Sequence, residues 1–339
     1  MTVSIDDRDP SVKPVELPAV LAALTSQLGT PVSLAAEPSR LSGGFWAEMW
    51  VLQFPVDCPR PGRAVLRLAP DAALAEVETA IHRAIAVQGF PTPAIIADGY
   101  DESGGRRWAL MEFANGQPLL AGLSGVQALV RLPAIARQLP ATLARVSAQL
   151  HALDAQPVTT ALADTGDGRA GVDGLLASHA ATAEATGDAT LARAIEHVVG
   201  TRPEAGAAVI CHGDLHPFNV LRDEHGELTV LDWTAARVVD REYDVAFTAM
   251  LLANPPLHAP AAVAPIIRGA ARRLAQRFVR DYERAARTTV HRRRLEWFTD
   301  LHGLRVLSEV AWWRYGGTLD EHRDHPWITM APTIERRYA

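Results

Sequence analysis

The 339-residue chain has few cysteines, no excess of basic residues and no long apolar run, and each shortage excludes a class of protein. Its two cysteines, Cys58 and Cys211, are too few for a disulfide framework and lack the spacing of a metal site. Both thiols are therefore expected to be reduced, which favours a cytoplasmic protein. No stretch is apolar enough to span a bilayer. The N-terminus, with Asp6, Asp7 and Asp9, does not read as a signal peptide.

The charge balance argues against a nucleic-acid partner. Lys and Arg number 33 and Asp and Glu number 39, giving a formal net charge of −6, whereas nucleic-acid binding depends on basic stripes that displace counterions. The apolar content of 48% and charged content of 21% are typical of a folded, soluble protein. A chain of this length is expected to form two domains.

The first third of the sequence predicts a small mixed domain. Residues 1–15 are polar and contain prolines, so a loose arm is expected there. Apolar periodicity and glycine stops then predict helices at 17–28 and 72–88, and strands at 33–41, 47–54, 63–68, 94–99 and 108–113. The order is one helix, three strands, a second helix and two strands.

The remainder of the sequence predicts a mainly helical domain. Asn115 to Pro118 break the pattern and indicate a hinge. Helices are then predicted at 134–153, 176–200 and 262–287, with a loop at 155–175 and a strand-rich hairpin at 208–233. The fold class is therefore α+β.

The most informative stretch is that hairpin, which reads ICHGDLHPFNVLRDEHGELTVLDW from Ile210 to Trp233. Asp214 follows an apolar strand, Asn219 comes five positions later, and Asp232 closes the next apolar run. The spacing suits a site in which one carboxylate faces a hydroxyl and two oxygen ligands hold magnesium. Phosphoryl transfer needs such an arrangement, because its chemistry is mostly positioning and charge neutralisation.

His212-Gly213-Asp214, Asn219 and Leu231-Asp232-Trp233 resemble the aminoglycoside phosphotransferase and choline kinase family, relatives of the protein kinases. The resemblance covers about residues 41–250. It implies a two-lobed, protein-kinase-like fold with a small β-rich lobe that carries one key helix. Residues 1–113 would form the nucleotide-binding lobe, and residues 114–339 a helical lobe with the catalytic and metal loops and the acceptor site.

The resemblance also implies roles for the residues of the catalytic stretch. Asp214 would accept a hydrogen bond from the acceptor hydroxyl and aim it at the γ-phosphate. Asn219 and Asp232 match the Mg²⁺ ligands, which are hard oxygen donors. His212 and His216 are read as supports of the loop rather than as metal ligands, because magnesium does not seek imidazole. Asp244 matches a carboxylate that braces this loop.

In the predicted small lobe, Ser42, Gly43 and Gly44 resemble the loop that covers the phosphates, although most such glycine pairs are plain turns. Arg67 occupies the position of the phosphate-binding cation, where protein kinases have lysine. Glu78 is the better match for its carboxylate partner, and Glu76 is the alternative.

The segment that would join the two lobes is Met111 to Ala114. The resemblance assigns the carbonyl of Glu112 and the amide of Ala114 to the adenine edge. These contacts come from the backbone, so the sequence leaves ATP and GTP both open.

Three further features each have a structural interpretation and a functional one. Asp240 and Glu242 could contribute to a cation-binding cleft, or pair with Arg237 or Arg241 in an exposed salt bridge. The aromatic run 311–315 could line an acceptor pocket, but core packing is simpler. The arginine-rich helix 262–287 is expected to be a packed helix with a solvated face, and no membrane partner is expected.

These observations predict an ATP- or GTP-dependent, Mg²⁺-dependent phosphotransferase that acts on a hydroxyl of a small molecule, such as an aminoglycoside, a macrolide or a similar antibiotic. A metabolic kinase for an amino alcohol or sugar is an alternative within the same chemistry. A catalytically silent, nucleotide-binding regulatory module is another alternative. A hydrolase built on Cys211 and His212 is a remote one. The sequence does not identify the acceptor or the oligomeric state.

Overall fold

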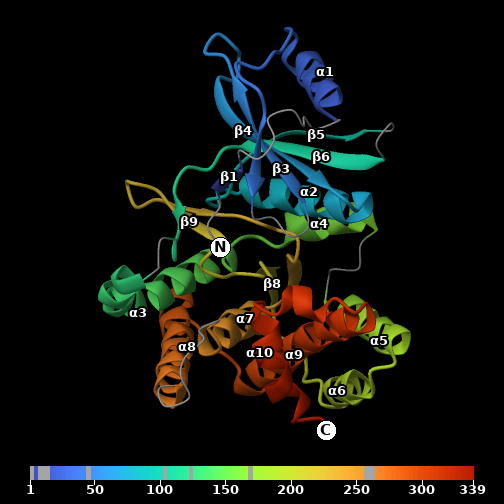
Figure 1. Cartoon of the computed structure of the whole chain (residues 1–339), viewed down its shortest axis with the longest axis vertical. Helices are drawn as coiled ribbons and strands as arrows, with labels where there is room; N and C mark the ends of the chain where they lie inside the picture. The colour runs from blue at the N-terminus through green and yellow to red at the C-terminus, as the bar shows by residue number, and fades with distance from the viewer. Residues whose placement is uncertain are drawn as a thin grey trace. The chain divides into compact units, whose positions relative to one another are not determined.

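The computed structural model describes residues 4–6, 16–42, 47–101, 105–121, 125–166, 171–255 and 264–339. The fold is α+β, with antiparallel strands in the N-terminal part and helices in the C-terminal part (Figure 1). Internal contacts divide the chain into two compact units. Unit 1 contains Met1–Leu129, Gln156–Asp167 and Pro217–Thr234, and unit 2 contains Val130–Ala155, Gly168–His216 and Ala235–Ala339. Segment Pro217–Thr234, which carries both expected metal ligands, thus clusters with the N-terminal strands.

Unit 1 is built on a six-stranded antiparallel sheet in the order β1-β2-β3-β4-β6-β5. Its strands are β1 (Ser4–Asp6), β2 (Ser39–Ser42), β3 (Glu48–Phe54), β4 (Gly62–Ala69), β5 (Ile95–Asp101) and β6 (Arg106–Glu112). β1 pairs with β2, so residues 4–6 of the expected loose arm form a strand, and the rest of that arm lies outside the described residues. Of the strand expected at 33–41, only the last residues form a strand, which is β2.

Alternation along β4 determines which way its side chains face. Leu66 and Leu68 are buried in one apolar core with Val20 and Leu24 of helix α1 (Leu17–Leu28). Because successive side chains of a strand point to opposite faces, Arg67 faces the other side of the sheet. Helix α2 (Ala72–Ala86) packs against β4, β5 and β6, and it carries the carboxylate that meets Arg67.

Two further pieces of the sequence complete unit 1. Helix α4 (Gln156–Thr165) packs beside α2 (Figure 1). A small antiparallel sheet has the order β10-β9-β7, formed by β10 (Leu228–Val230), β9 (Val220–Arg222) and β7 (Gln117–Pro118). The hairpin of β9 and β10 turns at Gly226, which has a φ of 86°.

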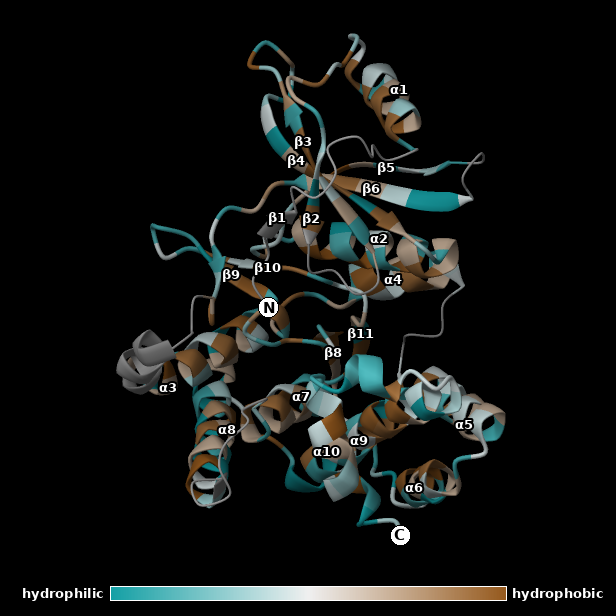
Figure 2. Ribbon diagram, viewed as in Figure 1, coloured by the Kyte–Doolittle hydropathy of each residue, from teal (hydrophilic) through white to brown (hydrophobic). Residues whose placement is uncertain are grey.

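Unit 2 consists of helices around a short strand pair. Strand β8 (Ala208–Cys211) pairs with β11 (Arg237–Asp240). The helices are α3 (Gly125–Leu150, from residue 130 onward in this unit), α5 (Asp173–Thr186), α6 (Ala189–Gly200), α7 (Glu242–Ala253), α8 (Ala264–Ala286), α9 (Arg292–Tyr315) and α10 (Pro326–Glu335). Brown and teal stretches alternate on several of them (Figure 2), which is typical of helices with one buried face. No helix within the described ranges is both long and apolar enough to cross a membrane.

The predicted elements are confirmed for helix α1, which ends at Gly29 in a left-handed conformation, and for α2, α8 and most strands. The loop expected at 155–175 is wrong over α4. The helix expected at 176–200 is wrong in its continuity, because Gly187 and Asp188 end α5 and cap α6. Helices α7, α10 and most of α9 are not predicted by the sequence pattern.

Candidate active site

The expected catalytic loop, His212 to Asp214, follows strand β8 in unit 2. Gly213 has a φ of 75°, and a side chain there would overlap the carbonyl of Ala235. Only glycine adopts this conformation without strain while allowing so close an approach of two backbones. The turn therefore depends on the HGD sequence itself, and it brings Asp214 to a partly exposed position after a buried strand.

Asp244, in the first turn of α7, holds this loop. It is buried, with 1% of its surface exposed, and its two carboxylate oxygens accept hydrogen bonds from the backbone N–H groups of His212 and Gly213 at 2.8 and 2.7 Å. Burial raises the pKa of Asp244, but His151 and these backbone donors lower it by more, so the pKa lies below its ordinary value. The bracing role that the sequence suggested for Asp244 has this geometry.

His151 extends the support away from the loop. Its Nε2 lies 3.2 Å from Asp244 Oδ2, and its Nδ1 lies 2.7 Å from the hydroxyl of Tyr282 on α8. His151, Cys211 and Asp244 bring one potential metal-binding atom each to within 4.8 Å of one another. The Asp244 carboxylate of that cluster already accepts hydrogen bonds from two backbone N–H groups, so we interpret the cluster as structural.

Asp214 itself lies beside an arginine and a histidine. Nη1 of Arg305 on α9 lies 3.2 Å from Oδ1, and Nε2 of His216 lies 3.4 Å from Oδ2. Burial raises the pKa of Asp214, but Arg305 and then His216 lower it by more, so the pKa lies well below its ordinary value. His212 accepts a hydrogen bond from the backbone N–H of Asp214 at 3.3 Å, through Nδ1. Both histidines thus contact Asp214, and their role as supports of the loop stays a prediction.

Cys211 does not have the surroundings of a nucleophile. The thiol is fully buried and faces the carbonyl oxygens of Val239 and Asp240 at 3.7 and 3.6 Å. Burial and the nearby Asp244 raise its pKa well above the ordinary value, so the reactive thiolate is suppressed. This environment argues against a hydrolase based on Cys211 and His212.

Asp240 and Glu242 form neither of the arrangements that the sequence suggested. Both are buried, and both lie beside Arg294 of α9, with Nε at 3.7 Å from Asp240 and 3.4 Å from Glu242. The backbone N–H of Gly206 also donates to Asp240. The expectation of an open cation-binding cleft or an exposed salt bridge is therefore wrong, because α9 supplies an inward-facing arginine.

In unit 1, the hairpin register places the two expected metal ligands at the same end. Val220 of β9 pairs with Val230 of β10, so Asn219 and Leu231 face each other one residue beyond. Leu231 N–H donates to the Asn219 carbonyl at 2.9 Å. Asp232 comes next and is exposed. An amide oxygen and a carboxylate at one hairpin end fit the hard oxygen donors that Mg²⁺ prefers.

The backbone at Asp232 is unusual. Its φ is 69°, in the left-handed region that aspartate tolerates better than most residues. The Thr234 hydroxyl donates to Asp232 Oδ1 at 2.6 Å, and the Thr234 N–H lies 3.2 Å from the same oxygen. These two contacts explain how the carboxylate holds its orientation after the strand ends. Thr234 therefore orients the Asp232 carboxylate.

Arg67 of β4 and Glu78 of α2 form an ion pair, as the sequence predicted. Thr234 joins them, since its hydroxyl accepts from Arg67 Nη2 at 3.1 Å and lies 3.3 Å from Glu78 Oε2. Burial lowers the pKa of Arg67 and the Glu78 carboxylate raises it by more, so the guanidinium remains charged. Glu76, the alternative partner, is half exposed and pairs with Arg107 instead.

The expected adenine-binding segment follows β6. Glu112 is exposed at the end of the strand, and its N–H donates to the Ala94 carbonyl at 3.0 Å. Arg63 steadies the residues beyond, with its guanidinium 3.8 Å from the Phe113 ring centroid and Nη2 donating to Asn115 at 3.0 Å. Ala114 lies between these two contacts in the chain. Of the expected phosphate-covering loop, Ser42 ends β2, and Gly43 and Gly44 lie outside the described residues.

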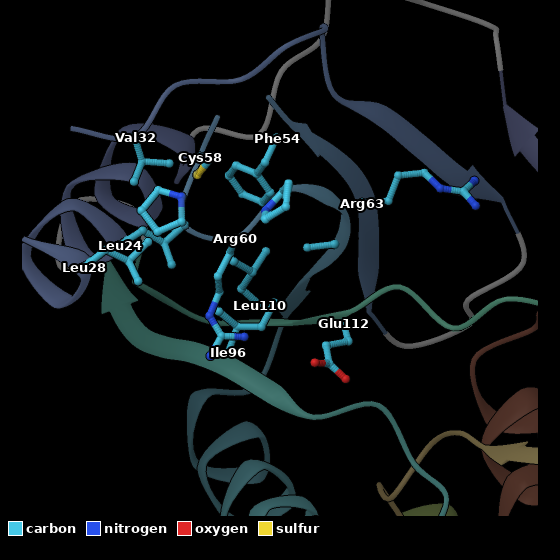
Figure 3. Close-up of a pocket in the computed structure, with 13 residues that line it drawn as sticks. Leu24, Leu28, Val32, Phe54, Cys58, Arg60, Arg63, Ile96, Leu110 and Glu112 are labelled. Atoms are coloured by element: carbon cyan, nitrogen blue, oxygen red, sulfur yellow. The ribbon is translucent and has the colours of Figure 1, made fainter. Parts of the chain in front are cut away.

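Unit 1 also contains a cavity of about 410 Å³. Figure 3 shows its apolar lining, which includes Leu24 and Leu28 of α1, Phe54 and Leu110, with Glu112 at one side. None of Arg67, Glu78, Asn219 and Asp232 lines it. The cavity lies over the sheet face that α1 covers, whereas Arg67 faces the opposite side, so it is not the pocket of the expected phosphate site.

Sequence reasoning missed several residues that the structure brings to these sites: Arg305, Thr234, His151 and Arg294. Arg305 and Arg294 lie on α9, whose charged and apolar residues gave no clear helical period, and nothing in their local sequence points to an aspartate far away in the chain. His151 ends an apolar helix, where a histidine is unremarkable. Only Thr234, two residues after Asp232, had a signal in its position.

A sequence profile of the phosphotransferase enzyme family matches residues 52–297, which is more than half of the chain. No curated protein matches the sequence. Among solved structures, a Ralstonia eutropha JMP134 protein classed with the aminoglycoside phosphotransferases is 19% identical, with a TM-score of 0.65 over 95% of this chain and 99% of that one.

Two further structures resemble the chain. A thermostable variant of aminoglycoside phosphotransferase APH(4)-Ia, in a ternary complex with ADP and hygromycin B, is 18% identical, covering 94% of this chain and 98% of its own at a TM-score of 0.58. Macrolide 2′-phosphotransferase MphH from Brachybacterium faecium is also 18% identical. The match covers 92% of this chain and 97% of that one, with a TM-score of 0.51. At these identities the likeness establishes the shared kinase-like fold.

Proposed function

The chain belongs to the phosphotransferase enzyme family, and from that premise we propose that it transfers the γ-phosphate of ATP or GTP to a hydroxyl group of a small molecule. The observation that carries the proposal is a pair of sites whose side chains are already held in place by their neighbours. One is an ionised, braced carboxylate at Asp214, and the other is a hairpin end with Asn219 and Asp232 beside the Arg67–Glu78 pair.

In this proposal Asp214 orients the acceptor. A carboxylate with a strongly lowered pKa is a weak base, so it works chiefly by accepting a hydrogen bond from the hydroxyl and aiming its oxygen at the phosphorus. As the new P–O bond forms and the bond from phosphorus to the β-phosphate oxygen breaks, the hydroxyl proton passes late to the Asp214 carboxylate, and ADP or GDP leaves. Asp244 keeps the loop in place during this step through its two backbone hydrogen bonds.

Residues of unit 1 handle the nucleotide. Arg67, charged and held by Glu78, offers a fork of N–H groups for the α- and β-phosphates. Asn219 and Asp232 would hold Mg²⁺, which would offset the charge of the phosphate groups. The backbone of Glu112 and Ala114 would bind the adenine or guanine edge, and Ser42, Gly43 and Gly44 the outer phosphates. We assign the nucleotide to residues 1–113, and the acceptor and both loops to residues 114–339.

The acceptor is proposed to be a hydroxylated small molecule of the kind that antibiotics and metabolites share. The similar structures include one with ADP and hygromycin B bound and one macrolide 2′-phosphotransferase, which supports a panel that begins with antibiotics. A metabolic kinase for an amino alcohol or sugar would use the same residues. A role in antibiotic resistance therefore follows only if an antibiotic is the best acceptor.

The proposal is tested by measuring ADP or GDP release across aminoglycosides, macrolides, choline-like alcohols and sugars, with and without Mg²⁺. We expect acceptor-dependent, Mg²⁺-dependent release by the wild type and a loss of at least about a hundredfold in Asp214→Ala. Equal, near-zero turnover by both proteins with every acceptor would favour the silent, nucleotide-binding module. Activity that needs no Mg²⁺ would contradict the assignment of Asn219 and Asp232.

A further inference from the structure

Arg305 on α9 is placed to act on the acceptor site. Its Nη1 lies 3.2 Å from Asp214 Oδ1 and donates to the Gly213 carbonyl at 3.1 Å, so one guanidinium ties the carboxylate to its own loop. The guanidinium carbon lies 5.2 Å from the Phe247 ring centroid and 5.1 Å from that of Trp327. Two aromatic faces and two hydrogen-bond acceptors leave this side chain 31% exposed and fix its position.

We propose that Arg305 determines the charge class of the acceptor, so that this enzyme phosphorylates neutral or anionic hydroxyl compounds in preference to polycationic ones. This inference rests on the proposed function and narrows it. Arg305 would act as a specificity-determining residue through the charge that it sets beside Asp214.

The first argument is the net charge around the reacting carboxylate. A guanidinium at 3.2 Å cancels most of the attraction that Asp214 would exert on an ammonium group. His216 and His212 also favour the charged form of Asp214, and Asp214 in turn acts on His325, so several of the groups beside this carboxylate are histidines. A cationic acceptor would therefore gain little attraction from Asp214 and would meet the positive guanidinium, which attracts an anionic acceptor.

The second argument concerns the carboxylates that could have bound a cation. Asp244 is buried and uses both oxygens on the catalytic loop. Asp240 and Glu242 are buried against Arg294. Glu309 lies one turn beyond Arg305 on α9, and burial raises its pKa, which disfavours its charged form. These four acids of unit 2 are thus matched by a partner or weakened.

The test compares acceptors that share hydroxyls and differ in charge: an aminoglycoside with its fully N-acetylated derivative, and glucosamine with N-acetylglucosamine. For each pair, kcat/KM is measured by ADP release, and binding is measured by calorimetry, which needs no turnover. We expect the uncharged member to be preferred at least about tenfold by the wild type. Arg305→Gln should reduce that preference about tenfold or more, and Arg305→Lys should restore most of it.

Arg337→Gln is the matched control, because it removes an arginine that pairs with Asp300 at an exposed position of the same unit. It should leave the preference unchanged. Thermal unfolding of each variant identifies a fold defect, and Arg305→Lys keeps the comparison informative if Arg305→Gln unfolds. The inference is overturned if the uncharged compounds neither react nor bind better than their cationic partners, or if Arg305→Gln keeps the wild-type preference. The proposed function fails separately, if no compound of any charge supports ADP release.

Discussion

At the scale of single residues, each proposed catalytic side chain has surroundings that suit one task. Asp214 is ionised and partly exposed, and a histidine and an arginine contact it. Asp232 is exposed at a hairpin end, and Thr234 orients it. The two aspartates belong to different compact units. They should therefore fail in different ways when they are changed.

Asp214→Asn should lower kcat by about 10²–10⁴-fold and change the nucleotide Kd little, since the residue works on the acceptor hydroxyl. Asp232→Ala should instead weaken Mg²⁺-dependent nucleotide binding by on the order of tenfold, or about 1.4 kcal/mol. Steady-state kinetics and a nucleotide titration at several Mg²⁺ concentrations separate the two effects. Unaltered Mg²⁺ dependence in Asp232→Ala, or a large rise in nucleotide Kd in Asp214→Asn, would contradict these roles.

How far the sequence predicts such residues depends on how local their signal is. Asp214, Asn219 and Asp232 could be named because they lie within one short stretch. The choice of Glu78 over Glu76 needed only helix phase, and the ion pair with Arg67 is present. Arg305 could not be predicted, because its contact with Asp214 depends on where α9 packs, which no short-range pattern encodes.

At the scale of elements, the catalytic turn depends on a backbone conformation and not only on side chains. Gly213 joins β8 to Asp214 with a positive φ, and the backbone of Ala235 lies directly against it. Gly226, in the turn between β9 and β10, also has a positive φ but has no atom within 4 Å of where a Cβ would lie. Substitution of these two glycines therefore distinguishes the cost of backbone strain, which both share, from the cost of steric overlap, which only Gly213 has.

Gly213→Ala should lower the free energy of unfolding by more than about 2 kcal/mol and abolish most activity, because the loop must move away from Ala235. Gly226→Ala should cost only the left-handed strain, about 1 kcal/mol, and keep kcat. Urea unfolding and kcat of both variants provide the check. Equal behaviour of the two would mean that close packing against Ala235 is unimportant.

The elements that the sequence did not predict share a physical cause. Nine of the twelve residues of α7 are buried, including Glu242 and Asp244, so the helix has no polar face to reveal its period. Residues 155–175 contain threonine, glycine and aspartate, which gave a loop-like composition, and packing of α4 against α2 favours a helix. By contrast α1 and α2, each with one buried face, were predicted nearly to the residue.

At the scale of the whole molecule, His82, His179 and His302 are three histidines of the described residues that burial keeps in their neutral forms. Burial lowers the pKa of His82 to about 4, that of His179 to about 4 and that of His302 to about 3. The unfolded chain would bind these protons near pH 6.5. Between that pH and about 4, the unfolded state thus holds more protons, so stability rises with pH and falls on acidification.

Acidification from pH 6.5 to 5 should therefore lower the free energy of unfolding by on the order of 1 kcal/mol per pH unit for each of His82, His179 and His302. His179→Gln should make that decline shallower. His225→Gln, which changes an exposed histidine, should not. Urea unfolding at a series of pH values measures the slopes. A stability that is flat or rising on acidification in this window would show that these side chains are not buried as neutral groups.

The most direct test of the central claim follows the phosphoryl group itself. The enzyme in excess is mixed with γ-labelled ATP, Mg²⁺ and the best acceptor of the panel, and the label is located after one turnover. The account predicts that wild-type enzyme moves the label from ATP to a hydroxyl of the acceptor and that Asp214→Asn does so at least about a hundredfold more slowly. Label that appears only as inorganic phosphate, or that reaches the acceptor equally fast in both proteins, would contradict it.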